Sequence, residues 1–289
     1  RYNWNGTDLS NPVLLLDLPG EPGPYHNGGK IKLGPDEQLY VVIGDLTTPS
    51  TILQNHVLDS DAIPNNTSVI IRIDPLNGNP SPDNPFKNQS QNDLIDNFSL
   101  DYYYAYGIRN SFGLSFDPIT GSLWDTENGE DKFDETNLVK PGFNSGWYKI
   151  MGPISRNKNF SENDLLMLNN SYYSDPKFSW FKPIGVTDLE FYNSSRLGNK
   201  FSNNIFVGGI NAGDLYFFKI DDNRTGIRID PSMSGHTDLT DSIADPQDDL
   251  SPTLFARGFS GRITDIETGP DGYVYVLTYS DGRLYRIVN

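Results

Sequence analysis

Several side chains able to move protons or stabilise charge stand in the polar segments between predicted strands of this chain. His26, one of three histidines, begins a segment that ends at Asp45. Arg109 and Asn110 follow a tyrosine-rich run further along the chain. A carboxylate beside an imidazole raises the basicity of the ring, and a guanidinium can stabilise developing negative charge. These residue types are the set that proton or hydride transfer requires.

An acidic, glycine-containing segment offers a second kind of chemistry. It contains five carboxylates on either side of a short loop: Glu127, Glu130, Asp131, Asp134 and Glu135. Hard oxygen ligands on a flexible loop suit calcium. A solvated acidic loop without a metal is the alternative, and the residues alone leave both interpretations open.

The elements that must position these residues are strands. Helical periodicity is nearly absent, and short alternating runs are bounded by Gly, Pro, Asn and Asp. Three segments share a strand, a Pro-Asp or Asp-Pro turn, and a second strand. These segments begin at Ile31, Leu114 and Ile266. Proline presets φ for a tight turn and aspartate bonds back to its own backbone, so this dipeptide favours a hairpin.

A further apolar run also recurs, at 69–74, 215–221 and 284–288. Sheets built from such repeated strands are the blades of a β-propeller. We therefore predict an all-β fold with one propeller domain over residues 1–289, interrupted by long polar loops at 44–68, 78–103 and 222–258. A β-sandwich would give similar short strands but would not explain the repeated turn.

Composition excludes several classes of function. The formal net charge of −16 argues against nucleic acid and against an anionic membrane surface as the main partner. No run of 18 apolar residues exists to span a bilayer. The absence of cysteine removes disulfides, thiolate nucleophiles and iron–sulfur ligation.

Acceptor motifs for N-glycans are frequent, which predicts an exported protein at the cell surface or in the extracellular space. The alternative is a loop composition that is simply rich in Asn, Ser and Thr. The motif occurs at Asn5, Asn65, Asn66, Asn88, Asn97, Asn159, Asn169, Asn193 and Asn223.

Through motifs that include His26, Asp45 and Arg109, the chain resembles the soluble glucose/sorbosone dehydrogenase family, the aldose sugar dehydrogenases that use pyrroloquinoline quinone. The resemblance covers roughly residues 24–289, and several motifs occur in the family's order. The strongest are HNGGKIKLGPDEQLYVVIGD, RIDPLNGNPSPDNPF, YAYGIRNSFGLSFDP, DETNLVKPGFNSGW and GRITDIETGPDGYVYVLT. The resemblance implies a six-bladed β-propeller that oxidises aldoses at C1, with a sugar substrate and an external electron acceptor.

The resemblance also implies a role for each site residue. His26 is the catalytic base, Asp45 orients it, and Arg109 stabilises negative charge on the quinone carbonyl. The cofactor contacts are Asn110, Asn128 and Arg262. Calcium at the cofactor is held by main-chain carbonyls of Gly129 and Glu130, and a second, structural calcium matches Glu135 with the main chain near Ser145.

Three positions depart from the family pattern. Ile108 stands where the family has a histidine, Asn211 where it has a lysine, and Thr264 where it has a second arginine. Pyrroloquinoline quinone carries three carboxylates, so two missing cations should cost several kcal/mol, at roughly 1.5–3 kcal/mol per charge-assisted contact. Lys30 and Lys32 are nearby cations whose heads the sequence does not place.

Only 25 residues precede His26, where the family has about two more blades. We therefore expect missing N-terminal blades, or a partner segment that closes the propeller. Two functions remain: an exported quinoprotein dehydrogenase, and a non-catalytic propeller that acts as a binding or structural glycoprotein. His26, Asp45 and Arg109 favour the enzyme, whereas the missing cations and the glycan motifs favour the second function.

Overall fold

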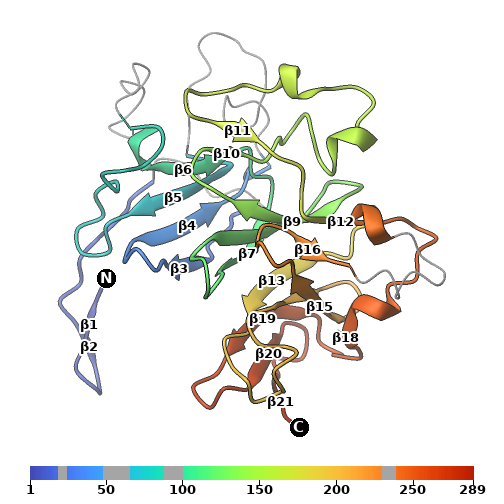
Figure 1. Ribbon diagram of the computed structural model, residues 1–289. Coiled ribbons are helices and arrows are strands. Elements are labelled where there is room, and N and C mark those ends of the chain that lie inside the picture. Colours follow the sequence, from blue (N-terminus) through green and yellow to red (C-terminus); the bar gives the residue numbers. More distant parts are fainter. Residues whose placement is uncertain (19–24, 48–65, 88–99, 230–238) are drawn as a thin grey trace.

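The computed structural model describes residues 1–18, 25–47, 66–87, 100–229 and 239–289. Over these residues the chain is a succession of short strands, most of them paired antiparallel (Figure 1). Its helices are single 3-10 turns at Leu100–Tyr102, Ile154–Arg156, Glu162–Asp164, Leu239–Asp241 and Ser251–Thr253. None of the helices in this part of the chain is long and apolar enough to cross a bilayer. The prediction of an all-β chain is confirmed.

Two sheets are built mainly from strands of the first half of the chain. The first sheet runs in the order β11-β10-β6-β5-β4-β3 and the second in the order β17-β12-β9-β8-β7. The first contains β3 (Ile31–Leu33), β4 (Leu39–Ile43), β5 (Val69–Ile73), β6 (Tyr103–Tyr106), β10 (Phe143–Asn144) and β11 (Tyr172–Tyr173). The second contains β7 (Ser111–Phe116), β8 (Leu123–Glu127), β9 (Asp134–Val139), β12 (Phe178–Trp180) and β17 (Ile243–Ala244).

Two further sheets and a hairpin complete the described structure. The third sheet has the order β13-β14-β15-β16, with β18 paired to β15, and the fourth has the order β19-β20-β21. The third contains β13 (Val186–Phe191), β14 (Ile205–Gly209), β15 (Leu215–Ile220), β16 (Ile227–Arg228) and β18 (Leu254–Ala256). The fourth contains β19 (Ile263–Thr268), β20 (Val274–Thr278) and β21 (Leu284–Ile287), and the hairpin contains β1 (Asn3–Trp4) and β2 (Leu9–Ser10).

The predicted turns join the first and second strands of three sheets, and the first and fourth sheets repeat the same side-chain contacts. In the β3–β4 turn the hydroxyl of Tyr40 donates to Asp36 at 3.0 Å, and Arg72 on β5 pairs with Asp36. In the β19–β20 turn Tyr275 donates to Asp271 at 3.0 Å, and Arg286 on β21 pairs with Asp271. Tyrosine and arginine face each other across the strands in both sheets. The recurring apolar run is the third strand of each of three sheets.

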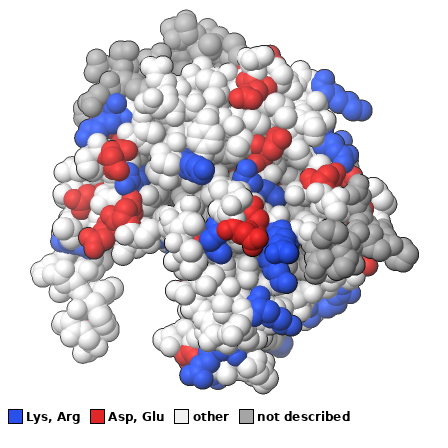
Figure 2. Space-filling model, viewed as in Figure 1, with Lys and Arg blue, Asp and Glu red and all other residues white. Residues whose placement is uncertain are grey.

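The sheets follow one another in an arc, and β13 packs against both β7 and β19 (Figure 1). Buried clusters of aliphatic and aromatic side chains fill the spaces between sheets. Among the described residues no strand pairing joins the first sheet to the fourth. Figure 2 shows the molecular surface hollowed between the N-terminal hairpin and the last sheet.

One loop prediction is wrong. Residues 222–258, expected to be a loop, contain β16, β17 and β18. These strands are only two or three residues long. β17 runs parallel to β12 of another sheet, and β18 pairs with β15, so their partners lie outside the segment. Their local sequence therefore carries no strand periodicity, because the pairing is tertiary.

Candidate functional site

Chain direction places the candidate residues at equivalent edges of their sheets. In an antiparallel meander, the start of the first strand and the end of the second lie at the same edge. His26 precedes β3, Arg109 precedes β7 and Arg262 precedes β19, while Asp45 follows β4 and Asn128 follows β8. Each of these residues thus lies at the edge of its own sheet where the first strand begins.

The imidazole of His26 pairs with the carboxylate of Asp45. Nδ1 of His26 lies 2.7 Å from Oδ1 of Asp45, and the two side chains are 16% and 8% exposed. The same Oδ1 accepts the backbone N–H of Thr47 at 2.8 Å, which fixes the carboxylate. A ring that donates from Nδ1 has Nε2 as its proton acceptor, so the pairing sets the tautomer that a general base requires.

The segment that carries Arg109 meets this pair through the backbone. The N–H of Asp45 donates to the carbonyl oxygen of Arg109 at 2.8 Å. Gly44 lies between the two segments, and a Cβ there would stand 2.4 Å from the carbonyl oxygen of His26 and 2.7 Å from that of Arg109. No other residue fits at this close approach. The structure therefore brings together the two segments that the sequence analysis singled out.

The guanidinium of Arg109 is fixed on three sides. Nη1 donates to the carbonyl oxygens of Asn128 and Gly129 at 2.9 and 3.0 Å, and the group lies 5.1 Å from the ring centre of Trp147. The backbone N–H donates to Oε2 of Glu127 at 3.0 Å. Nε is buried and has no hydrogen-bond partner among the described residues. Burial lowers the pKa of Arg109, so an anion at Nε would relieve a desolvated positive charge.

Buried carboxylates line one face of β8 and β9 below this rim. Glu127 stands opposite Glu135, and Asp125 stands opposite Asn137, in the register of the two strands. All three carboxylates are fully buried or nearly so. Both side-chain oxygens of Asp125 lack a hydrogen-bond partner within the described part of the chain. Burial raises the pKa of Asp125 and of Glu135, and the charge of Glu127 adds to both shifts. Burial also raises the pKa of Glu127 to about 7, although Ser145 and Arg109 oppose the shift.

These acids are not a solvated loop, because Asp125, Glu127 and Glu135 are buried. Ser145 donates from Oγ to Glu127, the backbone N–H of Gly152 donates to Glu135, and Glu127 stands opposite Glu135 on the two strands. Unpaired buried carboxylate oxygens are the donors that calcium prefers. Sequence reasoning included Glu127 in the acidic segment but did not single out Asp125. The period-two spacing of Asp125 and Glu127 on one strand is the signal that would have found it.

Gly129 and Glu130, the predicted main-chain ligands at the cofactor, occupy the β8–β9 loop. The carbonyl oxygen of Gly129 already accepts Nη1 of Arg109, and the side chain of Glu130 is exposed. Asp134 holds this loop against the start of β13, accepting the backbone N–H groups of Gly129, Gly185 and Val186 at 3.0, 2.7 and 3.0 Å. The loop is therefore shaped by Asp134, a role that the sequence did not reveal.

The predicted cofactor contacts differ in how they are placed. Oδ1 of Asn110 is buried without a hydrogen-bond partner among the described residues. Asn128 donates from Nδ2 to the carbonyl oxygens of Asn110 and Val186 at 3.2 and 2.8 Å, so its amide supports the rim. Arg262 is exposed at the start of β19. Orphaned polar atoms on Arg109 and Asn110 fit an anionic, hydrogen-bonding cofactor.

The three departures from the family pattern have different surroundings. Ile108 is fully buried in the cluster between the first two sheets, where a hydrophobic side chain belongs. Asn211 is exposed and donates to the carbonyl oxygen of Pro183 at 3.1 Å. Thr264 donates to the carbonyl oxygen of Leu277 at 3.4 Å. The heads of Lys30 and Lys32 form ion pairs on the inner side of the sheets, so they do not replace the missing rim cations.

The acceptor motifs for N-glycans divide into three groups. Asn5, Asn159, Asn169, Asn193 and Asn223 are exposed. The prediction at Asn66 is wrong, because this side chain is buried and accepts the hydroxyl of Tyr103. Asn65, Asn88 and Asn97 lie outside the described residues.

The chain is thus built from successive β-sheets, with an imidazole–carboxylate pair and a largely buried guanidinium where strands of the first two sheets begin or end. The family profile described as glucose/sorbosone dehydrogenase matches residues 4–286. The chain therefore belongs to the glucose/sorbosone dehydrogenase family.

Two curated relatives match almost the whole chain. An uncharacterized protein of Synechocystis is 30% identical over 293 residues, with 99% of this chain and 62% of the relative covered. The aldose sugar dehydrogenase YliI of Escherichia coli is 26% identical over 294 residues, with 99% of this chain and 67% of the relative covered. The chain thus spans about two thirds of the length of these relatives.

Solved structures share the fold. The PQQ-bound aldose sugar dehydrogenase of Streptomyces coelicolor superposes with a TM-score of 0.62 at 24% identity, with 97% of this chain and 67% of that chain covered. The apo form of the soluble aldose sugar dehydrogenase of Escherichia coli gives a TM-score of 0.66 at 22% identity, with 97% and 68% covered. The predicted fold class, an all-β propeller, is confirmed.

Proposed function

We propose that this chain carries the active-site rim of an exported dehydrogenase that oxidises aldose sugars at C1. The observation that carries the proposal is the 2.7 Å pair of His26 and Asp45 beside the segment of Arg109. Family membership and the likeness to aldose sugar dehydrogenases support the reaction class. The exposed glycan motifs and the net charge of −16 support an exported, soluble setting.

Each site residue has a role that its contacts support. His26, oriented by Asp45, accepts the proton of the sugar C1 hydroxyl at Nε2. Arg109 stabilises negative charge that develops in front of its buried Nε, where water is excluded and charge stabilisation is stronger. Pyrroloquinoline quinone, when bound, supplies the two-electron acceptor for the C1 hydride, and the sugar leaves as a lactone. An external acceptor then removes the electrons.

Calcium is proposed at two places. The residues that would hold it at the cofactor are Gly129 and Glu130, through main-chain carbonyls, and the structural site would use Glu135, Ser145 and the neighbouring Glu127. The buried carboxylates of Glu127 and Glu135, and the unpaired oxygens of Asp125 beside them on β8, support the second of these sites. A divalent cation there would offset the desolvated negative charge.

We also propose that residues 1–289 form one propeller domain that further strands complete to six blades. Apolar side chains stay exposed at both ends of the arc: Ile31 and Leu33 on β3, and Leu277 and Leu284 on β20 and β21. Exposed apolar faces and open sheet edges are features that proteins normally cover. A segment between these two ends would hide both, whether it belongs to this protein or to a partner.

A second candidate is a non-catalytic propeller that binds glycans or another surface protein. The neutral Asn211 and Thr264 favour it, since they leave Arg109 and the exposed Arg262 as the cations of the predicted cofactor set. The exposed glycan motifs are consistent with this function as well.

Titration with pyrroloquinoline quinone and calcium, followed by dye reduction with an aldose, separates the two functions. We expect bound-quinone absorbance and sugar-dependent dye reduction. His26→Ala should abolish turnover and leave quinone affinity within a few-fold, because the imidazole acts on the sugar. Asn27→Ala, an exposed neighbour in the same segment, serves as the matched control. Failure of the wild-type chain to bind quinone would favour the non-catalytic function, and turnover by His26→Ala would refute the base assignment.

A further inference from the structure

Charged side chains, not apolar ones, fill the space where the innermost strands of the sheets face each other. Lys30 and Lys32 come from the start of the first sheet, Asp188 and Glu190 from β13, and Asp265 and Glu267 from β19. Each pair is spaced by two residues, so each strand turns one charged face inward. We call these six residues the axial cluster. It lies apart from the His26–Asp45 pair and from the β8–β9 carboxylates.

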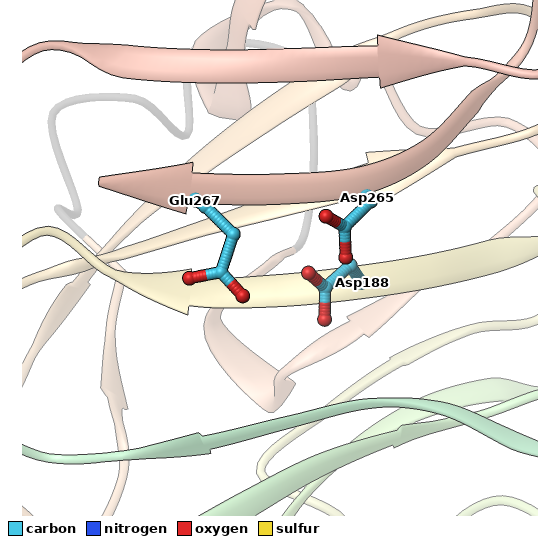
Figure 3. Close-up of side chains that lie close together, drawn as sticks. All are labelled: Asp188, Asp265 and Glu267. Atoms are coloured by element: carbon cyan, nitrogen blue, oxygen red, sulfur yellow. The ribbon is translucent and has the colours of Figure 1, made fainter. Parts of the chain in front are cut away.

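Three carboxylates of the axial cluster surround one ammonium group. Nζ of Lys30 lies 2.8 Å from Oδ2 of Asp188, 2.6 Å from Oδ1 of Asp265 and 3.6 Å from Oε1 of Glu267. One oxygen from each carboxylate lies within 4.8 Å of the others, the spacing of ligands around a metal ion. Figure 3 shows Asp188 and Asp265 pointing toward one another from neighbouring strands, with Glu267 beside them.

Asp188 is the buried member of this group and is only partly satisfied. It is fully buried, and Oδ2 accepts the backbone N–H of Ile266 at 3.0 Å in addition to Lys30. Oδ1 is buried without a hydrogen-bond partner among the described residues. Such an oxygen is costly to desolvate and points to a place for positive charge.

The charges of the axial cluster do not balance. Lys32 lies 2.5 Å from Glu267 and 3.9 Å from Glu190, so two ammonium groups face four carboxylates. Burial raises the pKa of Asp188 even though Lys30 opposes this shift. The axial cluster can therefore accept more positive charge. Loss of one ammonium group would leave a larger excess of carboxylates.

We propose that Asp188, Asp265 and Glu267 form a cation site whose resident cation is the ammonium group of Lys30, and that this site binds a divalent cation such as Ca²⁺ when the ammonium group is removed. Lys30 then acts as a covalently attached substitute for a metal ion. Because it reaches from the first sheet to β13 and β19, it joins sheets that no strand pairing connects in the described residues.

This inference does not depend on the proposed enzyme activity, because it concerns charge and stability alone. A tethered ammonium group cannot be removed by chelators, so the link between the sheets is independent of calcium supply. A calcium site at Glu135 and Ser145, by contrast, would empty on chelation. The two sites therefore respond differently to the same treatment.

The test compares calcium binding and thermal unfolding of Lys30→Met and wild type. In EDTA, Lys30→Met should lower the Tm by roughly 5–10 °C, because it leaves buried carboxylates without their cation. With millimolar CaCl₂, the Tm of Lys30→Met should rise by more than that of wild type. Equilibrium dialysis should show that Lys30→Met binds one more Ca²⁺ per chain than wild type. Lys30→Gln, which can still donate one hydrogen bond, is measured in parallel in case Lys30→Met does not fold.

Two controls decide the interpretation. Adding Asp265→Asn to Lys30→Met should abolish the extra calcium, since one of the three ligands is lost. Arg156→Met removes a cation that also pairs with two carboxylates, Asp241 and Asp245, but this pair is exposed. It should change Tm little and add no calcium. An unchanged calcium stoichiometry in both Lys30 variants would overturn the proposal.

Discussion

Replacing Asp45 by Asn tests the proposed role of His26 as the general base. Asparagine keeps the shape of the side chain, and its Oδ1 can still accept from Nδ1 of His26 and from the N–H of Thr47, which lie 2.7 and 2.8 Å away in the native structure. The N–H of residue 45 still donates to the carbonyl oxygen of Arg109. Only the negative charge beside the imidazole is removed.

The size of the effect follows from that lost charge. A hydrogen bond to a charged group contributes about 1.5–3 kcal/mol, and one between neutral groups about 0.5–1.5 kcal/mol. The imidazolium that forms as His26 accepts a proton therefore loses roughly 1–2 kcal/mol of stabilisation. At about 1.4 kcal/mol per factor of ten, kcat/KM should fall roughly 5- to 30-fold, with the larger part in kcat.

Steady-state dye reduction by the quinone-loaded protein measures this change. Asp74→Asn is the matched control, because Asp74 also accepts the backbone N–H two residues on, that of Leu76 at 2.7 Å, but in a distant turn. A kcat/KM of Asp45→Asn within two-fold of wild type would refute the reasoning.

Two other substitutions probe the buried acids and the missing cation. Burial raises the pKa of Glu127 to about 7 from an ordinary 4.5, so the folded chain holds a proton that the unfolded chain releases, and stability falls as pH rises from 4.5 through 7. Urea unfolding with EDTA at about pH 5 and pH 8 measures this loss of stability. In Glu127→Gln the loss should be smaller than in wild type, by up to roughly 3 kcal/mol. An equal loss in the two proteins would contradict the prediction. If residue 211 faces the cofactor, Asn211→Lys should tighten quinone binding roughly 10- to 100-fold in a fluorescence titration. Equal affinity would show that residue 211 does not contact the cofactor.

Much of the fold could be predicted because its signals are local. The Pro-Asp turns at Asp36 and Asp271 act within a few residues, and the apolar runs that became β5, β15 and β21 have clear strand composition. The missed strands β16, β17 and β18 are short and depend on distant partners. A propensity argument cannot find them.

The part of the site that could be predicted is the pair of residues contained in one segment of the sequence. His26 and Asp45 lie on the same hairpin, so their pairing followed from spacing and from the family resemblance. The stacking of Arg109 on Trp147 and the bonds of Asp134 to the start of β13 connect different sheets. Contacts between sheets leave no pattern in any single stretch of sequence, and the destination of Lys30 could not be inferred for the same reason.

The reach of Lys30 has a consequence for how the chain assembles. Its hydrogen bond to Asp265 joins residues 235 positions apart, and so does that of Lys32 to Glu267. Such distant pairs form late, since closing a long loop carries an entropic cost before any contact forms. During synthesis the two ammonium groups therefore meet Asp188 and Glu190 of β13 first, and Asp265 and Glu267 only after β19 has left the ribosome. A nascent chain that stops before residue 263 would hold only half of the four carboxylates of the axial cluster, so its two ammonium groups would face two carboxylates instead of four.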